Sequence, residues 1–193
     1  MDDQIIGNLV AASHILANEG VLDGLGHVSM RHPDNPQRYL MSRSLAPALV
    51  TASDVLEYDL DSNAVEGRGR ELFLERFIHG EAYKARPDVM AVIHSHSPTT
   101  IPFSVSRTPL QPVFNGAAFL SPSVPVFDIR NVAGMTDLLI GNAARPSARP
   151  WGKAPWHCCA ATATSWSERL CSKSSIGRSK RSSMLGCSFR LRC

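Results

Sequence analysis

An apolar run at residues 89–93 most constrains the fold, because it predicts a buried strand directly after a helix. Apolar residues at helical spacing predict that helix over residues 71–85. Pro87 ends it, since proline disfavours helical geometry at the residue before it. A helix, a tight turn and a buried strand together form an α/β unit.

Two histidines, His94 and His96, follow the strand directly. Strand side chains alternate between faces, so these two share a face, about 7 Å apart along the backbone. Two imidazoles placed in this way can hold a divalent metal. The alternative is a hydrogen-bonded or solvated pair at a strand end. The short spacing alone leaves both interpretations open.

Glu75 lies 19 residues before His94, on the first turns of the predicted helix. A carboxylate there can fold back towards the end of the strand. Alternatively, it is a solvated residue near the positive end of the helix dipole.

The rest of the chain predicts a single α/β domain with mostly short elements. A helix is expected over residues 5–19, and a turn of helix at residues 51–54. A tight turn is expected at residues 61–63, and a further helix begins in residues 136–144. The strands are expected at residues 27–31, 38–41 and 55–60, and around residues 112–114 and 124–127.

Several motifs in a fixed order resemble the class II aldolase/adducin family over about residues 5–144. They are Glu75 and the segments 24–31, 51–55, 83–89, 94–97 and 124–127. The resemblance implies a three-layer α/β fold of the class II aldolase type, with a central, mainly antiparallel sheet flanked by helices. It also implies a homo-oligomer, usually a tetramer, with the active site near a subunit interface.

The resemblance further implies a metal site on His94 and His96, with Glu75 as the catalytic acid or base. The family adds a third histidine in a Gly-His-Gly triplet, roughly sixty residues further on. This chain has no such triplet, and its only later histidine is His157. The third metal ligand is therefore missing from the sequence as written.

The composition changes near Ala144. Residues 145–193 contain ten Lys and Arg against one acidic residue and all five cysteines, whereas residues 1–144 contain ten against sixteen and no cysteine. With G/C-rich codons, residues 156–166 read two bases later encode Ala-Leu-Leu-Arg-Gly-His-Gly-Asp-Val-Val, which includes the missing triplet. We therefore expect residues 1–144 to form an incomplete family domain, followed by a frameshifted, poorly ordered tail at 145–193. The alternative is a genuine basic, cysteine-bearing tail.

The substrate side departs from the sugar-phosphate aldolases of the family. Those enzymes hold phosphate with a Gly-Asn-x-Ser segment and a Ser-Ser pair before the glutamate, where this chain has His27 and the apolar residues 72–74. Arg43 can bind a carboxylate by a bidentate fork, or it is a solvated loop arginine. The resemblance implies that a small carboxylate substrate is bound by His27, Ser29, Arg43 and Ser44.

These observations predict a carbon–carbon lyase that depends on a divalent metal such as zinc or manganese. We expect a decarboxylase of a hydroxylated aromatic or ring-cleavage dicarboxylate. A sugar-phosphate aldolase and a non-catalytic, adducin-like assembly module are the alternatives. The missing histidine leaves the activity of this chain open.

The sequence argues against a membrane protein and against nucleic-acid binding, and it favours the cytoplasm. The sequence has no run of 18 apolar residues, which argues against a membrane helix. The acidic N-terminus differs from a signal peptide and favours the cytoplasm. The basic tail has few aromatic residues, which argues against nucleic-acid binding.

Overall fold

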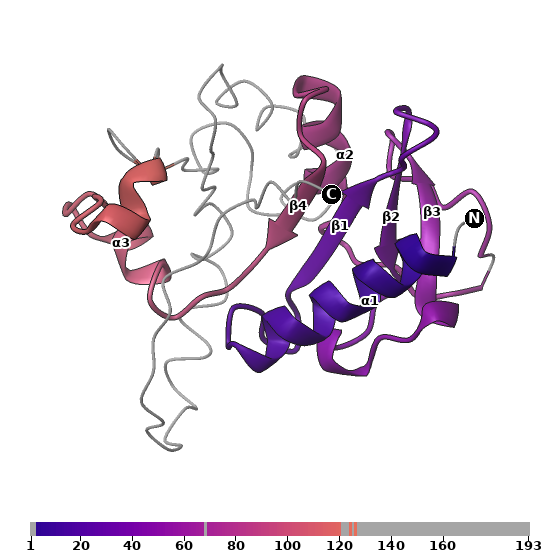
Figure 1. Cartoon of the computed structure of the whole chain (residues 1–193), viewed down its shortest axis with the longest axis horizontal. Coiled ribbons are helices and arrows are strands. Elements are labelled where there is room, and N and C mark those ends of the chain that lie inside the picture. The colour runs from indigo at the N-terminus through magenta and orange to yellow at the C-terminus, as the bar shows by residue number, and fades with distance from the viewer. Residues whose placement is uncertain (1–2, 68, 121–123, 125, 127–193) are drawn as a thin grey trace.

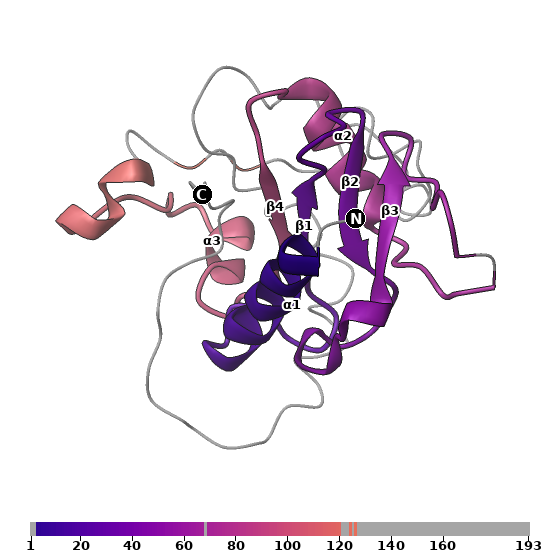
Figure 2. The same ribbon diagram turned by 45° about the vertical axis from the view of Figure 1, so that its right-hand side comes forward.

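A four-stranded antiparallel sheet forms the centre of the computed structural model, which describes residues 3–67, 69–120, 124 and 126 (Figure 1). The strand order is β3-β2-β1-β4. Helix α1 (Asp3–Asn18) covers one face and α2 (Arg76–Ala85) the other (Figures 1 and 2). The strands are β1 (His27–Arg31), β2 (Arg38–Ser42), β3 (Val55–Asp59) and β4 (Ala91–His94). The expected sheet flanked by helices is confirmed.

Alternation along the strands divides the core between the two faces of the sheet. Leu9 of α1 packs with Val28 and Leu40 on one face. Ala82 and Tyr83 of α2 pack on the other face, in a cluster with Tyr39, Met41, Leu56, Tyr58, Phe73 and Val92. The neighbours of Val28 in β1 therefore point towards α2, and so does the residue that follows Ile93 in β4. The residues that point towards α2 are therefore His27 and Ser29 in β1 and His94 in β4.

The described remainder is connected by short helical segments. A side-chain contact closes the expected helical turn at residues 51–54, where the Thr51 hydroxyl donates to the Asp54 carboxylate at 2.6 Å. This turn is η2 (Ala52–Asp54), and the other short segments are η1 (Pro47–Leu49), α3 (Ile101–Val105) and η3 (Asn115–Leu120). Within the described ranges, no helix is both long and apolar enough to cross a membrane.

The helix expected to begin at residue 71 begins instead at Arg76, so Glu75 is its N-cap residue and does not lie on its first turns. Two contacts hold residues 71–74 away from helical geometry. The Ser44 backbone N–H donates to the Glu71 carbonyl at 2.8 Å, and the Phe73 ring packs against the ring of His27, with centroids 4.2 Å apart. The apolar spacing of this segment reflects the core and not a helix.

The strand expected at residues 112–114 is absent, and the segment is irregular. Val113 is 79% exposed and Phe114 58% exposed, so these side chains bury little of the apolar surface that would stabilise a strand. Val124 and Val126 are not in a strand either, and the rest of the segment expected there lies outside the described residues. The helix expected in residues 136–144 also lies outside them.

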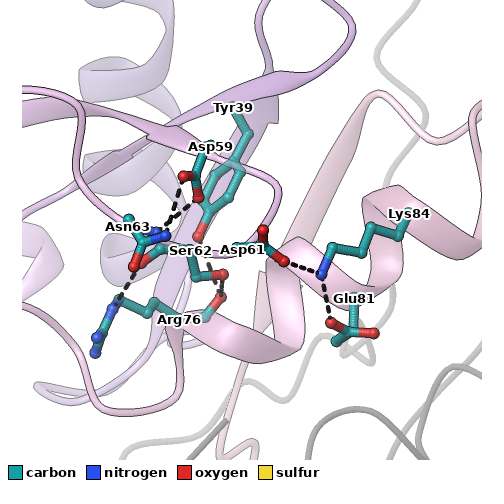
Figure 3. A network of polar contacts seen from close by, with 8 residues as sticks. All are labelled: Tyr39, Asp59, Asp61, Ser62, Asn63, Arg76, Glu81 and Lys84. Carbon is teal, nitrogen blue, oxygen red and sulfur yellow. Dashed lines mark hydrogen bonds and ion pairs between the residues drawn. The ribbon is translucent and has the colours of Figure 1, made fainter.

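A polar network joins the hairpin after β3 to the start of α2 (Figure 3). Ser62 has a φ of 65° and is 1% exposed. The Arg76 side-chain Nε donates to the Ser62 carbonyl at 2.9 Å, and the Ser62 hydroxyl donates to the Arg76 carbonyl at 3.2 Å. The Tyr39 hydroxyl donates to the same carbonyl at 3.2 Å. This network positions the residue before Arg76, which is Glu75.

Gly80 allows α2 to approach the hairpin closely. A Cβ at Gly80 would lie 2.5 Å from the Leu60 carbonyl oxygen and 2.4 Å from the Ser62 hydroxyl oxygen. We expect Gly80→Ala to lower the free energy of unfolding by about 1–3 kcal/mol, because overpacking outweighs the gain in helix propensity. Denaturant titration measures this change.

Gly7 provides the control for that substitution, because it also lies inside a helix, but a Cβ added there would have no heavy atom within 4 Å beyond its own helix backbone and chain neighbours. Gly7→Ala should raise the free energy of unfolding by roughly 0.5–1 kcal/mol. Equal effects at both positions would contradict the close approach at Gly80.

Candidate functional site

The ends of β4 and α2 bring three candidate metal ligands together. His94 ends β4 and His96 follows it, and their Nε2 atoms lie 3.1 Å apart. A Glu75 carboxylate oxygen lies 3.1 Å from Nε2 of His94. Two nitrogens bound to one zinc ion at roughly 2.0–2.1 Å in tetrahedral geometry would be separated by a similar distance. Nε2 of His94 can therefore share a divalent metal with His96 or with Glu75. The ligand atoms that all lie within 4.8 Å of one another are those of His27, Glu75 and His94.

The Glu75 side chain makes no capping hydrogen bond at the start of α2. Its carboxylate turns to His94 and not to the helix backbone. Burial raises the pKa of Glu75, but the hydrogen bond to His94 and the electrostatic effect of His94 and His96 lower it by more, so the net shift is downward. Glu75 is therefore ionised at neutral pH.

His27, at the start of β1, lies beside this cluster. Its ring stacks on that of His94, with centroids 4.9 Å apart. One ligand atom from each of His27, Glu75 and His94 lies within 4.8 Å of the others, so His27 is a further candidate ligand. Burial lowers the pKa of His27 well below its ordinary value, and the neighbouring histidines lower it further. His27 is therefore neutral.

A buried hydrogen-bond chain extends from His27 into α2. Nδ1 of His27 lies 2.8 Å from Nε2 of His79, and Nδ1 of His79 lies 2.6 Å from the Ser29 hydroxyl. That hydroxyl lies 2.7 Å from the hydroxyl of Tyr83. Ser29 is fully buried, so its hydroxyl faces α2 and not an open site.

Asp23 orients His96 from the loop before β1. Its carboxylate lies 3.2 Å from Nδ1 of His96 and accepts the backbone N–H groups of Leu25 at 3.0 Å and Gly26 at 2.8 Å. The hydrogen bond to His96 lowers the pKa of Asp23 to about 2 despite its partial burial, and the same bond raises the pKa of His96. An ionised carboxylate on Nδ1 directs the Nε2 lone pair of His96 towards His94.

The remaining expected residues, Arg43 and Ser44, follow β2. Arg43 Nε donates to the Asp54 carboxylate at 2.7 Å. This arginine is therefore not simply solvated, because a carboxylate of the protein already binds it. Because Ser29 pairs with Met41 in the antiparallel register, the end of β2 lies at the same end of the sheet as His27. The structure thus gathers Glu75, His94, His96, His27 and Ser29, with Arg43 and Ser44 at the same sheet end.

Three residues at the site were missed by the sequence interpretation: Asp23, His79 and Tyr83. Glu75, His79 and Tyr83 are spaced by four, which places them on one side of a helix. That spacing was a usable signal for the two α2 residues. Asp23 carried no comparable signal, since its partner His96 is 73 residues away.

Replacing Asp23 tests its effect on metal binding. We expect Asp23→Asn to lower zinc affinity by roughly 10–100-fold, because the carboxylate no longer orients His96. Calorimetric titration with Zn²⁺ measures the change. Asp59→Asn is the matched control, since Asp59 also accepts a backbone N–H in a turn, from Asn63 at 2.9 Å, but makes no contact with a histidine. Equal affinities of both variants would show that Asp23 only stabilises its loop.

The sequence profile of the class II aldolase and adducin N-terminal domain matches residues 7–167. The match passes residue 144, where the sequence predicts the end of the family domain. Residues 127–167 lie outside the described part of the chain, so the frameshift stays a prediction.

The chain is similar to several proteins, among them two curated proteins and one solved structure. It is 37% identical over 142 residues to decarboxylase tropJ of Talaromyces stipitatus, covering 71% of this chain and 53% of that protein. It is 31% identical over 157 residues to 3,4-dihydroxyphthalate decarboxylase of Arthrobacter keyseri, covering 72% and 62%. The structure of L-fuculose 1-phosphate aldolase from Glaciozyma antarctica PI12 matches with a TM-score of 0.57 and 29% identity, covering 72% and 56%. The chain spans little more than half the length of these relatives.

Proposed function

Because the chain belongs to the class II aldolase and adducin N-terminal domain family, we propose that it is a metal-dependent carbon–carbon lyase. Its reaction is the decarboxylation of a hydroxylated aromatic or ring-cleavage dicarboxylate. The observation that carries the proposal is the position of Nε2 of His94, which lies 3.1 Å from Nε2 of His96 and 3.1 Å from a carboxylate oxygen of Glu75. The similarity to two proteins named decarboxylases supports the reaction type.

His94 and His96 hold the metal in this proposal, with Nε2 of each as the ligand atom. A divalent cation there supplies a Lewis acid that draws electron density from a substrate oxygen. Imidazole ligands suit zinc, manganese and similar ions. Asp23 orients His96 for this role through the contact at Nδ1.

Glu75 transfers the proton in this proposal. Its lowered pKa leaves a carboxylate that can accept a proton from a substrate hydroxyl. When carbon dioxide leaves, the electron pair of the broken carbon–carbon bond remains on carbon, and Glu75 can return the proton to that atom. One residue then serves as base and as acid.

The substrate class follows from the residues around the ligands. The segment before Glu75 offers no hydroxyl group for a phosphate, and Phe73 is buried against His27. Among the described residues Arg43 bonds Asp54 through Nε, which leaves the outer edge of its guanidinium for a substrate carboxylate. Ser44 follows it in the same loop. A substrate with two carboxylates can anchor one of them and lose the other.

The third ligand belongs to the segment beyond residue 144. We propose that the missing histidine lies in the alternative frame of codons 156–166, and that a frame-restored chain assembles as a homo-oligomer. Sequencing the DNA around codons 140–166 tests this directly. If the alternative frame encodes no Gly-His-Gly, the tail is genuine and the site has only two histidine ligands of the family type.

The activity can be tested with a defined substrate. We expect a frame-restored chain loaded with Zn²⁺ or Mn²⁺ to release carbon dioxide from 3,4-dihydroxyphthalate or a related hydroxylated dicarboxylate. L-fuculose 1-phosphate is the comparison substrate, and its cleavage should be at least 100-fold less efficient, since buried phosphate without donors is unfavourable. Manometry and an aldehyde assay measure the two reactions. Efficient cleavage of the sugar phosphate would reverse the assignment.

A further inference from the structure

The proposed function leaves the buried hydrogen-bond chain of His27, His79, Ser29 and Tyr83 without a role. The chain joins β1 to α2 through three short contacts of 2.8, 2.6 and 2.7 Å. At its far end, Nε2 of His27 is buried and lacks a hydrogen-bond partner among the described residues. One nitrogen of the same ring lies within 4.8 Å of ligand atoms of Glu75 and His94, and the ring stacks on that of His94 with centroids 4.9 Å apart. The chain therefore ends at the candidate active site.

Both imidazoles are buried, with 1% of His27 and 0% of His79 exposed, and their partners in the hydrogen-bond chain are another imidazole and a hydroxyl group. A buried imidazolium without a carboxylate partner is costly, so both rings are neutral. A neutral imidazole has one N–H and one lone pair. His79 must therefore donate at one ring nitrogen and accept at the other, so its tautomer determines which nitrogen of His27 is protonated and whether the Ser29 hydroxyl donates to it or accepts from it.

Two directions are possible, and they differ in the hydrogen atom that is left over. In the first, Tyr83 donates to Ser29, Ser29 donates to His79, and His79 donates to Nδ1 of His27, which leaves the N–H of His27 at Nε2. In the second, His27 donates to His79 and His79 donates to Ser29, and one hydrogen of the Ser29 and Tyr83 hydroxyl groups has no acceptor in the contacts of the described residues. A buried donor without an acceptor is costly. The first direction leaves its spare N–H beside a site where a substrate oxygen can accept it.

We propose that Tyr83, Ser29 and His79 hold the proton of His27 on Nε2, so that His27 donates a hydrogen bond to a substrate oxygen and is not a metal ligand. Only the identity of the acceptor rests on the proposed lyase function. A donor aimed at an oxygen that gains negative charge stabilises the transition state more than the ground state. Ser29, His79 and Tyr83 are positioning residues, because they act through His27.

This assignment separates His27 from the other two histidines of the site. His94 and His96 present Nε2 atoms 3.1 Å apart with Glu75 beside them, as expected for ligands. In the proposed state His27 carries a hydrogen on Nε2, and a protonated nitrogen cannot bind a metal. The site then combines a metal-binding side with a neutral donor side.

Long-range proton–nitrogen NMR of the full chain, labelled with nitrogen-15, tests the proposal at neutral pH. Without metal, His27 should show an Nε2-protonated ring. With saturating Zn²⁺, the Nε2 signals of His94 and His96 should shift, while His27 keeps its Nε2 proton. An Nδ1-protonated His27 in the free protein, or loss of its Nε2 proton on adding Zn²⁺, would overturn the proposal.

Substituting Ser29 tests the role of the hydrogen-bond chain. Ser29→Ala removes the donor to His79 and should raise the Nδ1-protonated form of His27 roughly two- to tenfold, the factor for losing one net hydrogen bond. Ser13→Ala is the matched control, since Ser13 is a buried serine on the α1 face whose hydroxyl donates to the Leu9 carbonyl at 3.0 Å. An unchanged His27 in a folded Ser29→Ala protein would refute the positioning role.

The NMR experiment separates this proposal from the lyase function. If Zn²⁺ does not bind but His27 is protonated at Nε2, the hydrogen-bond chain acts as proposed and the metal-dependent function fails. If Zn²⁺ binds through His27, the lyase function can stand while the proposed role of the hydrogen-bond chain is wrong. The metal titration of the protein without substitutions shows which nitrogen of His27 is protonated even if the Ser29 variant does not fold.

Discussion

Replacing Glu75 by glutamine is expected to lower the turnover of a frame-restored chain by roughly 10²–10⁴-fold, the usual range for a positioned acid or base. Glutamine keeps the shape of the side chain but cannot accept and return a proton. Glu75 is the carboxylate beside His94, 3.1 Å from its Nε2 atom, and it makes no capping hydrogen bond that could explain its position otherwise. Steady-state kinetics of carbon dioxide release measure the loss.

Glu81→Gln is the control for this substitution, because Glu81 lies on the same helix but pairs with Lys84 at 2.8 Å (Figure 3). It should leave turnover within about twofold, since exposed ion pairs contribute little. Metal content distinguishes two roles of Glu75. If Glu75→Gln retains its metal, Glu75 acts on the substrate. If metal and activity are lost together, Glu75 is a ligand and another group must transfer the proton.

Replacing His94 or His96 by alanine is expected to abolish divalent metal binding by the chain as it stands. Each imidazole recovered in a preorganised site contributes on the order of 4 kcal/mol, or about 10³-fold in affinity. Two histidines already bind more weakly than the three of the family, so losing one leaves no usable site. Calorimetry with Zn²⁺ measures the affinity of each variant.

His32→Ala serves as the control, because His32 follows β1 at the opposite end of the sheet and its Nδ1 accepts the Asp34 backbone N–H at 3.2 Å. Restoring the reading frame should raise affinity by a factor similar to the one lost on removing His94. If the His94 and His96 double variant binds as much metal as the parent, neither histidine is a ligand, and the metal site must be sought elsewhere.

Local patterns determined much of the fold. The alternation in residues 27–31 predicted β1 with both its ends, and the start of β2 was predicted at residue 38. Each of these patterns depends on residues close together in the chain, where side-chain alternation and turn-forming residues act directly. His94 and His96 were paired as candidate ligands from their spacing, but β4 ends at His94, so His96 follows the strand and is not part of it.

The start of α2 was predicted wrongly because distant residues decide it. Apolar spacing cannot distinguish a helix from an irregular segment that packs its side chains into the core. Phe73 packs on His27, and the Glu71 carbonyl accepts from Ser44, so both contacts depend on segments far away in sequence. Glu75 was singled out as a candidate from the sequence, and its catalytic role stays a prediction, but its place as the N-cap of α2 follows from these contacts.

The chemistry available at the site could be read from the residues alone: two imidazoles at the end of a strand and one carboxylate near the start of a helix. Their protonation and orientation depend on the folded chain. Asp23 fixes His96 and has its own pKa lowered to about 2 by that contact, and His79 faces His27 across the β1–α2 interface at 2.8 Å. Burial and hydrogen bonding set these states, and both arise from packing between elements 50 or more residues apart. A sequence pattern can name the donor atoms, but the direction in which each donates depends on the neighbours that folding supplies.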